Sequence, residues 1–156
     1  MWATRGMMTN RRFEQLVSEG IEAIPPRFLA KLENVAVVIA EEPSPAQLEQ
    51  SNTKEGETLL GLYEGIPLIE RGEAYGGMVL PDKITIFKFP ILEEAAKSSC
   101  SSAVIARSAK GEFRREDDNE IRRVVKETVW HEIAHYFGYD DFAIETREDE
   151  GTNYSL

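Results

Sequence analysis

The sequence is poor in several residue types, and each shortage excludes a class of protein. Its 156 residues include one cysteine, Cys100, so no disulfide can form within the chain and nothing indicates an oxidising compartment. Basic residues are outnumbered, with 18 Lys and Arg against 28 Asp and Glu and a net charge of −10. This acidity argues against binding to nucleic acid or an anionic membrane, because both bind to basic patches. Apolar runs are short, and none could span a bilayer.

The remaining composition is that of an ordinary globular protein. The opening residues, MWATRGMMTNRRF, contain no apolar segment of the kind found in secretory signals, so we expect a cytoplasmic protein. The chain is long enough for one domain with a single apolar core. We predict an N-terminal extension over residues 1–10 and one domain over residues 11–156. Polar stretches at 41–58 and 98–116 are expected to form loop excursions from that domain.

Short strands are predicted in the middle of the chain. The run NVAVVIA, residues 34–40, is β-branched and almost entirely apolar, which is typical of a strand buried on both faces. Residues 59–69 form a second candidate strand. Residues 82–89 alternate as a third strand, which Pro90 is expected to end. Residues 91–98 are a candidate short helix.

Longer helices are predicted on either side of these strands. Apolar residues recur at helical spacing over residues 11–24, and the following prolines end that pattern. A second helical pattern runs from Asp117 to Phe137, with acidic residues in its first turn and Gly138 as its stop signal. We therefore expect a small α+β domain in which a short sheet packs against an N-terminal and a C-terminal helix.

The chain contains two histidines, and both lie in the last predicted helix. His131 and His135 are four residues apart, so their imidazoles project from one face and can bind one metal ion. Zinc accepts neutral histidine nitrogens at about 2.0–2.1 Å. Glu132 follows the first histidine, where its carboxylate can act on a water molecule at the metal. This H-E-x-x-H arrangement is typical of zinc metalloproteases. The alternative is a structural helix that carries two histidines by coincidence.

A catalytic zinc normally has a third protein ligand, and no third histidine exists. The ligand must then be a carboxylate or Cys100. A left-handed residue at Gly138 would fold the chain back towards the metal. Asp141, six residues after the second histidine, is our first choice. Asp140 is one position away from it, and Glu145 would require a longer loop.

The segment HEIAHYFGYDD resembles the metzincin consensus with its last histidine replaced by aspartate. The wider chain is similar to the small zincin-like metallopeptidases called minimal zincins over most of residues 11–142, through FEQLVSEGIEAIP, NVAVVIAEEPS, GLYEGIPLIER and LPDKITIFKFPI. The resemblance implies a short mixed sheet, an active-site helix, and Zn²⁺ bound by His131, His135 and Asp141 with Glu132 as general base. Unlike metzincins, this chain has no methionine after Met78 and only a short tail after the aspartate.

These features predict a zinc-dependent metallopeptidase with a peptide or protein substrate, and they leave its oligomeric state open. Two alternatives remain: a non-catalytic module in which zinc ties the last helix to its tail, and a metal-dependent hydrolase of a non-peptide bond. An open coordination position would favour an enzyme, and a fourth protein ligand the module. Tyr139 or Tyr154 could stabilise an oxyanion. Strand 83–89 is a candidate edge for pairing with an extended peptide, or an ordinary strand of the sheet.

Overall fold

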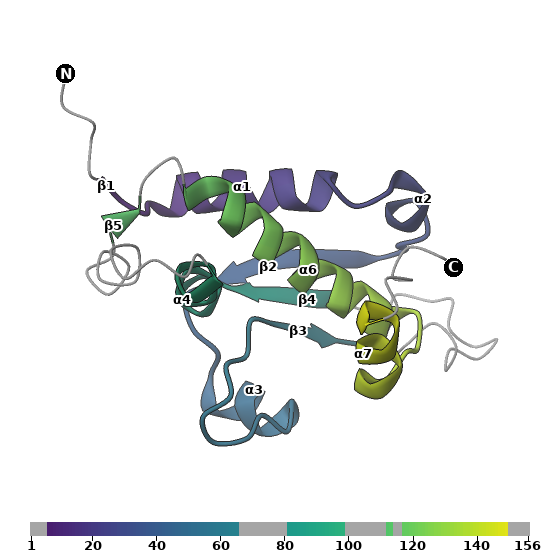
Figure 1. Cartoon of the computed structure of the whole chain (residues 1–156). Helices are drawn as coiled ribbons and strands as arrows, with labels where there is room; N and C mark the ends of the chain where they lie inside the picture. Colours follow the sequence, from purple (N-terminus) through teal and green to yellow (C-terminus); the bar gives the residue numbers. More distant parts are fainter. Residues whose placement is uncertain (1–5, 66–80, 99–111, 114–116, 150–156) are drawn as a thin grey trace.

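The chain folds into a small mixed sheet covered by helices, as the α+β prediction expects (Figure 1). The structure, a computed structural model, describes residues 6–65, 81–98, 112–113 and 117–149. In chain order its elements are β1 (Gly6–Met7), α1 (Asn10–Glu22), α2 (Pro26–Leu29), β2 (Val35–Ala40), α3 (Pro45–Gln50), β3 (Gly61–Glu64), β4 (Asp82–Phe87), α4 (Lys88–Ser98), β5 (Glu112–Phe113), α6 (Asp118–Tyr136) and α7 (Asp141–Asp149).

Three strands form the main sheet, in the order β2-β4-β3. The central strand β4 pairs in parallel with β2, with Val35 opposite Asp82, and antiparallel with β3, with Gly61 opposite Ile86. The predicted mixed sheet is therefore confirmed. The proposal that strand 83–89 is a peptide-binding edge is wrong, because β4 is paired on both sides. In this sheet the outer strands are β2 and β3.

Strand β2 is present where it was predicted, but it is not buried on both faces. Val37, Val38 and Ile39 are 38%, 39% and 37% exposed. The reason is its position, since β2 is an outer strand and α6 packs on β3 and β4. The apolar run therefore marks a strand but not a central one.

The two long helices lie close to their predicted positions and pack against each other. Figure 1 shows α6 in front of the strands, with α1 above it. A Cβ on Gly20 of α1 would lie 2.7 Å from Cγ1 of Val125 on α6, so the glycine allows the helices to approach closely. The core between them and the sheet includes fully buried side chains from each layer: Phe13, Ile84, Ile86, Ile121, Val125 and Ile133.

Helix α4 begins earlier than expected. The strand ends at Phe87, and Pro90 lies in the first turn of the helix, where its missing N–H costs no hydrogen bond. The buried Nζ of Lys88 donates to the carbonyl of Met8 at 2.8 Å and to Oδ1 of Asn10 at 2.7 Å. Met8 is itself part of the core. Met8 and Asn10, which lie in the predicted extension over residues 1–10, therefore contact the folded domain.

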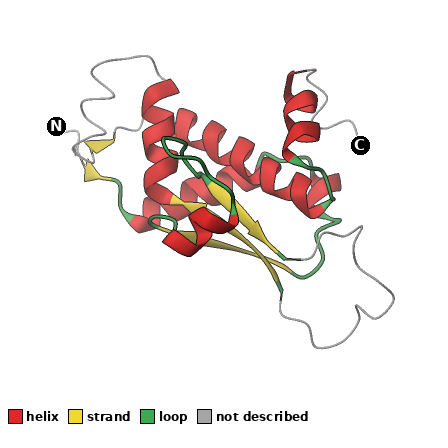
Figure 2. Ribbon diagram, turned by 90° about the horizontal axis from the view of Figure 1, so that it is seen from below, coloured by secondary structure: helices red, strands yellow, loops and turns green. Residues whose placement is uncertain are grey.

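The excursion at 41–58 is not entirely loop, because it contains α3. Ser44 and Gln47 form a capping box at its start: the Gln47 N–H donates to Ser44 Oγ at 3.2 Å, and the Ser44 N–H donates to Gln47 Oε1 at 3.0 Å. Figure 2, viewed from below, shows α3 and its loops on the near side of the strands. Most of 98–116 lies outside the described residues, apart from β5, which pairs with β1.

No helix in the described ranges is both long enough and apolar enough to cross a bilayer.

Candidate functional site

Helix α6 carries the histidine pair at its C-terminal end, and its termination is defined by backbone hydrogen bonds. Gly138 has a φ of +95°, the left-handed conformation predicted for it. Its N–H donates to the carbonyl of His135 at 2.9 Å, and the N–H of Tyr139 donates to the carbonyl of Ala134 at 3.1 Å. This pattern is a Schellman motif. It ends the helix at Tyr136, directly after His135, and turns the chain back beside the pair.

The two imidazoles lie together on α6. The ring centroids of His131 and His135 are 5.0 Å apart, and both side chains are half-buried. Nδ1 of His135 is 3.0 Å from the carbonyl oxygen of Tyr139. When Nδ1 carries the proton and donates to this carbonyl, Nε2 presents its lone pair, as in histidines that bind metal. The turn at Gly138 thus also orients a candidate ligand.

Glu132 is buried beside the histidines and is bonded to the sheet. Its side chain is 6% exposed, and Oε2 accepts a hydrogen bond of 2.8 Å from the backbone N–H of Tyr63 on β3. A Cβ on Gly61 would lie 2.8 Å from Cγ2 of Thr128 and 3.4 Å from Cγ of Glu132. The glycine therefore lets the strand approach the helix closely enough for this contact. Sequence analysis missed Tyr63, because no local pattern reports the partner of a backbone N–H.

The side chain of Tyr63 forms a second contact that holds β3 in place, with Asp82 of β4. Its hydroxyl donates to Oδ2 of the buried Asp82 at 2.6 Å. A Cβ on Gly65 would lie 2.4 Å from Cγ of Asp82, so the glycine leaves room for this carboxylate. The ring of Tyr63 also meets Tyr136 of α6 edge-on, with centroids 6.2 Å apart. These contacts fix the residue whose N–H holds Glu132.

The two aspartates after the helix differ in their roles. Oδ1 of Asp140 accepts from the N–H of Ala143 at 2.8 Å, and its carbonyl accepts from the N–H of Ile144 at 3.0 Å. Asp140 is therefore the N-cap of α7, a helix that sequence analysis missed. Asp141 is the first residue of that helix.

The side chains of Asp141 and Glu145, and all of Cys100 and Tyr154, lie outside the described residues. Among the side chains that are described, no three His, Cys, Asp or Glu gather into a metal-sized cluster.

A cleft of about 440 Å³ opens over these groups. Its walls come from β3 and its lead-in, from α6, and from the turn that follows; they include Leu59, Gly61, Tyr63, His131, Glu132, His135, Gly138, Tyr139 and Asp140. The ring of Tyr139 faces the guanidinium of Arg147 at 5.1 Å. The two imidazoles on one helix face are donors that suit zinc, and the buried carboxylate of Glu132 lies beside them without belonging to the donor set. The site therefore fits the ion.

Comparison with known families agrees with this chemistry. A model of the family described as zincin-like metallopeptidase matches residues 32–108 and 100–151, more than half of the chain. The matched segments include β2, β3, β4, α6 and α7. No curated protein matches the sequence.

Proposed function

The chain belongs to the zincin-like metallopeptidase family, and we propose that it is a zinc-dependent peptidase that hydrolyses peptide bonds in peptide or protein substrates. The observation that carries this proposal is the position of Glu132. Its buried carboxylate is held by the N–H of Tyr63 in a cleft that both histidines line. A structural zinc site has no use for an oriented carboxylate of this kind, whereas a hydrolase needs it as a base.

Zinc would be bound by His131, His135 and Asp141. The imidazoles supply two nitrogens from one helix face, and the carbonyl of Tyr139 orients the second of them. Asp141 is assigned as the third ligand because Asp140 already serves as the cap of α7. Three protein ligands would leave a fourth coordination position for water or substrate, as in catalytic zinc sites.

The protein groups at the site have separate roles in the proposed hydrolysis. Bound zinc supplies Lewis acidity, which polarises the carbonyl and makes water a stronger nucleophile at neutral pH. Glu132 accepts the proton that the attacking water loses and transfers it to the amide nitrogen as the C–N bond breaks, so that a carboxylate and an amine are formed. The N–H of Tyr63 fixes the orientation of this carboxylate through Oε2.

The substrate backbone is proposed to lie along β3 instead of the strand first considered. β3 is an outer strand of the described sheet and forms one wall of the cleft opposite α6. An extended peptide can add to such a strand through main-chain hydrogen bonds. Of the two candidates for stabilising an oxyanion, Tyr139 lines the same cleft, and Tyr154 lies outside the described residues.

The direct test measures zinc and cleavage on the same preparation. Elemental analysis is expected to give one zinc per chain, and mass spectrometry of a digested peptide library is expected to show cuts. Chelation should abolish these cuts, and added Zn²⁺ should restore them. Stoichiometric zinc with four protein ligands and no cleaved peptide would identify the non-catalytic module instead. Hydrolysis of ester or amide substrates without any peptide cleavage would identify the other hydrolase.

A further inference from the structure

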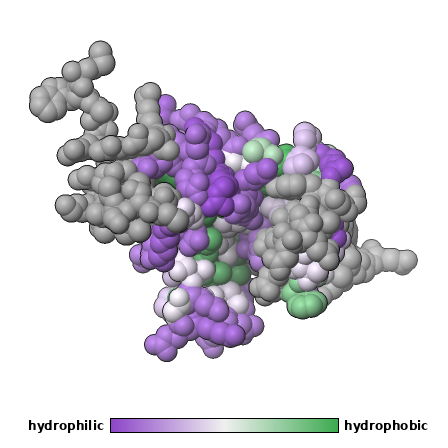
Figure 3. Space-filling view, viewed as in Figure 1, coloured by the Kyte–Doolittle hydropathy of each residue, from purple (hydrophilic) through white to green (hydrophobic). Residues whose placement is uncertain are grey.

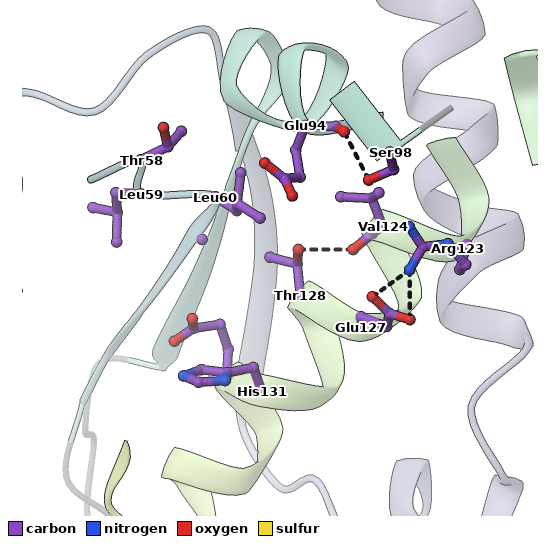
Figure 4. A pocket seen from close by; sticks show the side chains of 12 residues that line it. Thr58, Leu59, Leu60, Glu94, Ser98, Arg123, Val124, Glu127, Thr128 and His131 are labelled. Atoms are coloured by element: carbon purple, nitrogen blue, oxygen red, sulfur yellow. Dashed lines mark hydrogen bonds and ion pairs between the residues drawn. The ribbon is translucent and has the colours of Figure 1, made fainter. Parts of the chain in front are cut away.

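A second pocket adjoins this cleft along the middle of α6, from Arg123 to Glu132. It has a volume of about 480 Å³ and shares Leu59, Gly61, His131 and Glu132 with the cleft. Figure 4 shows it between α4, α6 and the segment that leads into β3. The two cavities therefore adjoin at these four residues.

The pocket has apolar walls. Leu59 and Leu60 line it from the strand side, and Val124 and Thr128 line it from α6. Figure 3 shows hydrophobic surface in the hollow between the helices and the lobe that contains α3. The hydroxyl of Thr128 donates to the carbonyl of Val124 at 2.7 Å and so is used within the helix. These walls suit an aliphatic chain.

The charged groups at the other end of the pocket are mainly negative. Arg123 donates to both carboxylate oxygens of Glu127 at 2.8 Å and to Oε1 of Glu120 at 3.0 Å. The bonds to Glu120 and then Glu127 raise the pKa of Arg123 further above its usual range. In Figure 4 the carboxylate of Glu94 points from α4 into the pocket. At this end of the pocket the lining therefore holds one positive charge, Arg123, and two negative charges, Glu94 and Glu127, and Arg123 is also bonded to Glu120 outside the lining.

No neighbouring cation on α4 compensates for Glu94 among the described contacts. Lys97 pairs with Glu93 at 3.0 Å, and both side chains are more than half exposed. Neither residue lines the pocket.

We propose that this pocket is a substrate subsite that accepts a lysine or arginine side chain on one side of the scissile bond. The aliphatic stem of that side chain would pack against Leu59 and Val124, and its charged end would meet Glu94 and Glu127. This inference rests on the proposed peptidase function, because the pocket is open to the cleft in which hydrolysis is proposed. It goes further by naming the side-chain class that the enzyme selects.

The test uses the zinc-loaded full chain and a randomised peptide library. Lys and Arg are expected to be enriched about fivefold over Leu and Met at one position beside the cut. This is the ratio that the free energy of one partly exposed charge pair produces. Glu94→Gln should reduce this enrichment. Glu93→Gln removes the same charge from the outer face of α4 and should leave it unchanged. Arg123→Gln should increase it, because Glu127 is then no longer neutralised. Cuts with no basic preference at any position would overturn the subsite.

A binding measurement separates the subsite from the peptidase activity. Lysine hydroxamate and norleucine hydroxamate carry the same zinc-binding group and differ in the charged end of the side chain. The lysine compound is expected to bind about fivefold more tightly to wild type, and Glu94→Gln should remove the difference. This result without any peptide cleavage would support the subsite and contradict the proposed function. Equal affinities, or binding of neither compound, would overturn the subsite.

Discussion

The backbone N–H of Tyr63 donates a 2.8 Å hydrogen bond to Oε2 of Glu132, and this bond joins an outer strand of the sheet to the helix that carries both histidines. Because the hydroxyl of Tyr63 is in turn bonded to Asp82, the carboxylate of Glu132 is held relative to the whole sheet. An oriented carboxylate costs little reorganisation when a proton is transferred. The fold therefore positions the proposed base before any substrate arrives.

Replacing Glu132 by Gln should lower turnover without changing the fold or the zinc content. The amide oxygen of glutamine can still accept from the N–H of Tyr63, so the fold and the zinc content should be unchanged. The proton acceptor is lost, and kcat should fall by about 10²–10⁴-fold, the usual contribution of a general base. Peptide cleavage and elemental analysis of the same samples measure the two effects. Equal turnover by the variant and wild type would eliminate the mechanism.

Replacing His135 by Ala should lower the zinc content sharply, because one of two imidazoles on the same helix face is removed. Tyr139→Phe is a suitable control. It keeps the carbonyl that bonds to His135 and should retain zinc, whatever the hydroxyl contributes to turnover. Zinc per chain after dialysis is the measured quantity. A full equivalent of zinc in the alanine variant would show that the metal is bound elsewhere.

The neighbouring aspartates should respond differently to amide substitution. Asp140→Asn should keep zinc and stability, since asparagine caps helices as well as aspartate does. Asp140→Ala should cost about 1 kcal/mol of unfolding free energy through loss of the cap of α7. Asp141→Asn should reduce zinc affinity by removing the proposed anionic ligand. Zinc loss from Asp140→Asn with full retention in Asp141→Asn would transfer the ligand role to Asp140.

Adding a methyl group at Gly61 should disturb the contact between β3 and α6. The new Cβ would lie 2.8 Å from Cγ2 of Thr128 and 3.2 Å from the carbonyl oxygen of Thr85. Gly61→Ala should therefore cost about 1–3 kcal/mol of unfolding free energy in urea titrations, and it should lower kcat by displacing the N–H that holds Glu132. Thr128→Ser removes Cγ2 and should recover part of both losses in the double variant. Strict additivity would show that the two residues do not meet.

The ion pair between Glu19 on α1 and Arg122 on α6 should make stability depend on pH. The side-chain hydrogen bond from Arg122, followed by that from Gln15, lowers the pKa of Glu19 below its ordinary value of 4.5. The pair therefore contributes stability above that value, and the contribution is lost as pH falls through the lower folded pKa. Arg122→Gln should raise the pKa of Glu19 in an NMR titration. The difference in unfolding free energy between the variant and wild type should shrink below about pH 4.5. An unchanged pKa would contradict the pairing.

Several features of the site follow from the sequence because they depend on contacts within a few residues. A spacing of four places His131 and His135 on one helix face wherever that helix lies. Gly138 ends the helix through bonds to residues only a turn away. The capping box of Ser44 and Gln47 is an equally local pattern, from which the start of α3 could have been predicted. The N-cap of α7 is Asp140, which the sequence pattern suggested only as a possible metal ligand.

Only the tertiary structure decided which distant groups meet at that helix. The N–H of Tyr63 and the carboxylate of Glu132 are far apart in sequence, and their hydrogen bond depends on the order β2-β4-β3 and on the close approach at Gly61. The same order left Val38 exposed on β2 and placed Glu94 beside Glu127 around one pocket. Side-chain periodicity specifies which face of an element is apolar but not which neighbour covers it. The sequence alone therefore determined the helix that carries the histidine pair, whereas packing determined the orientation of Glu132, the proposed base, and the charge of the adjoining pocket.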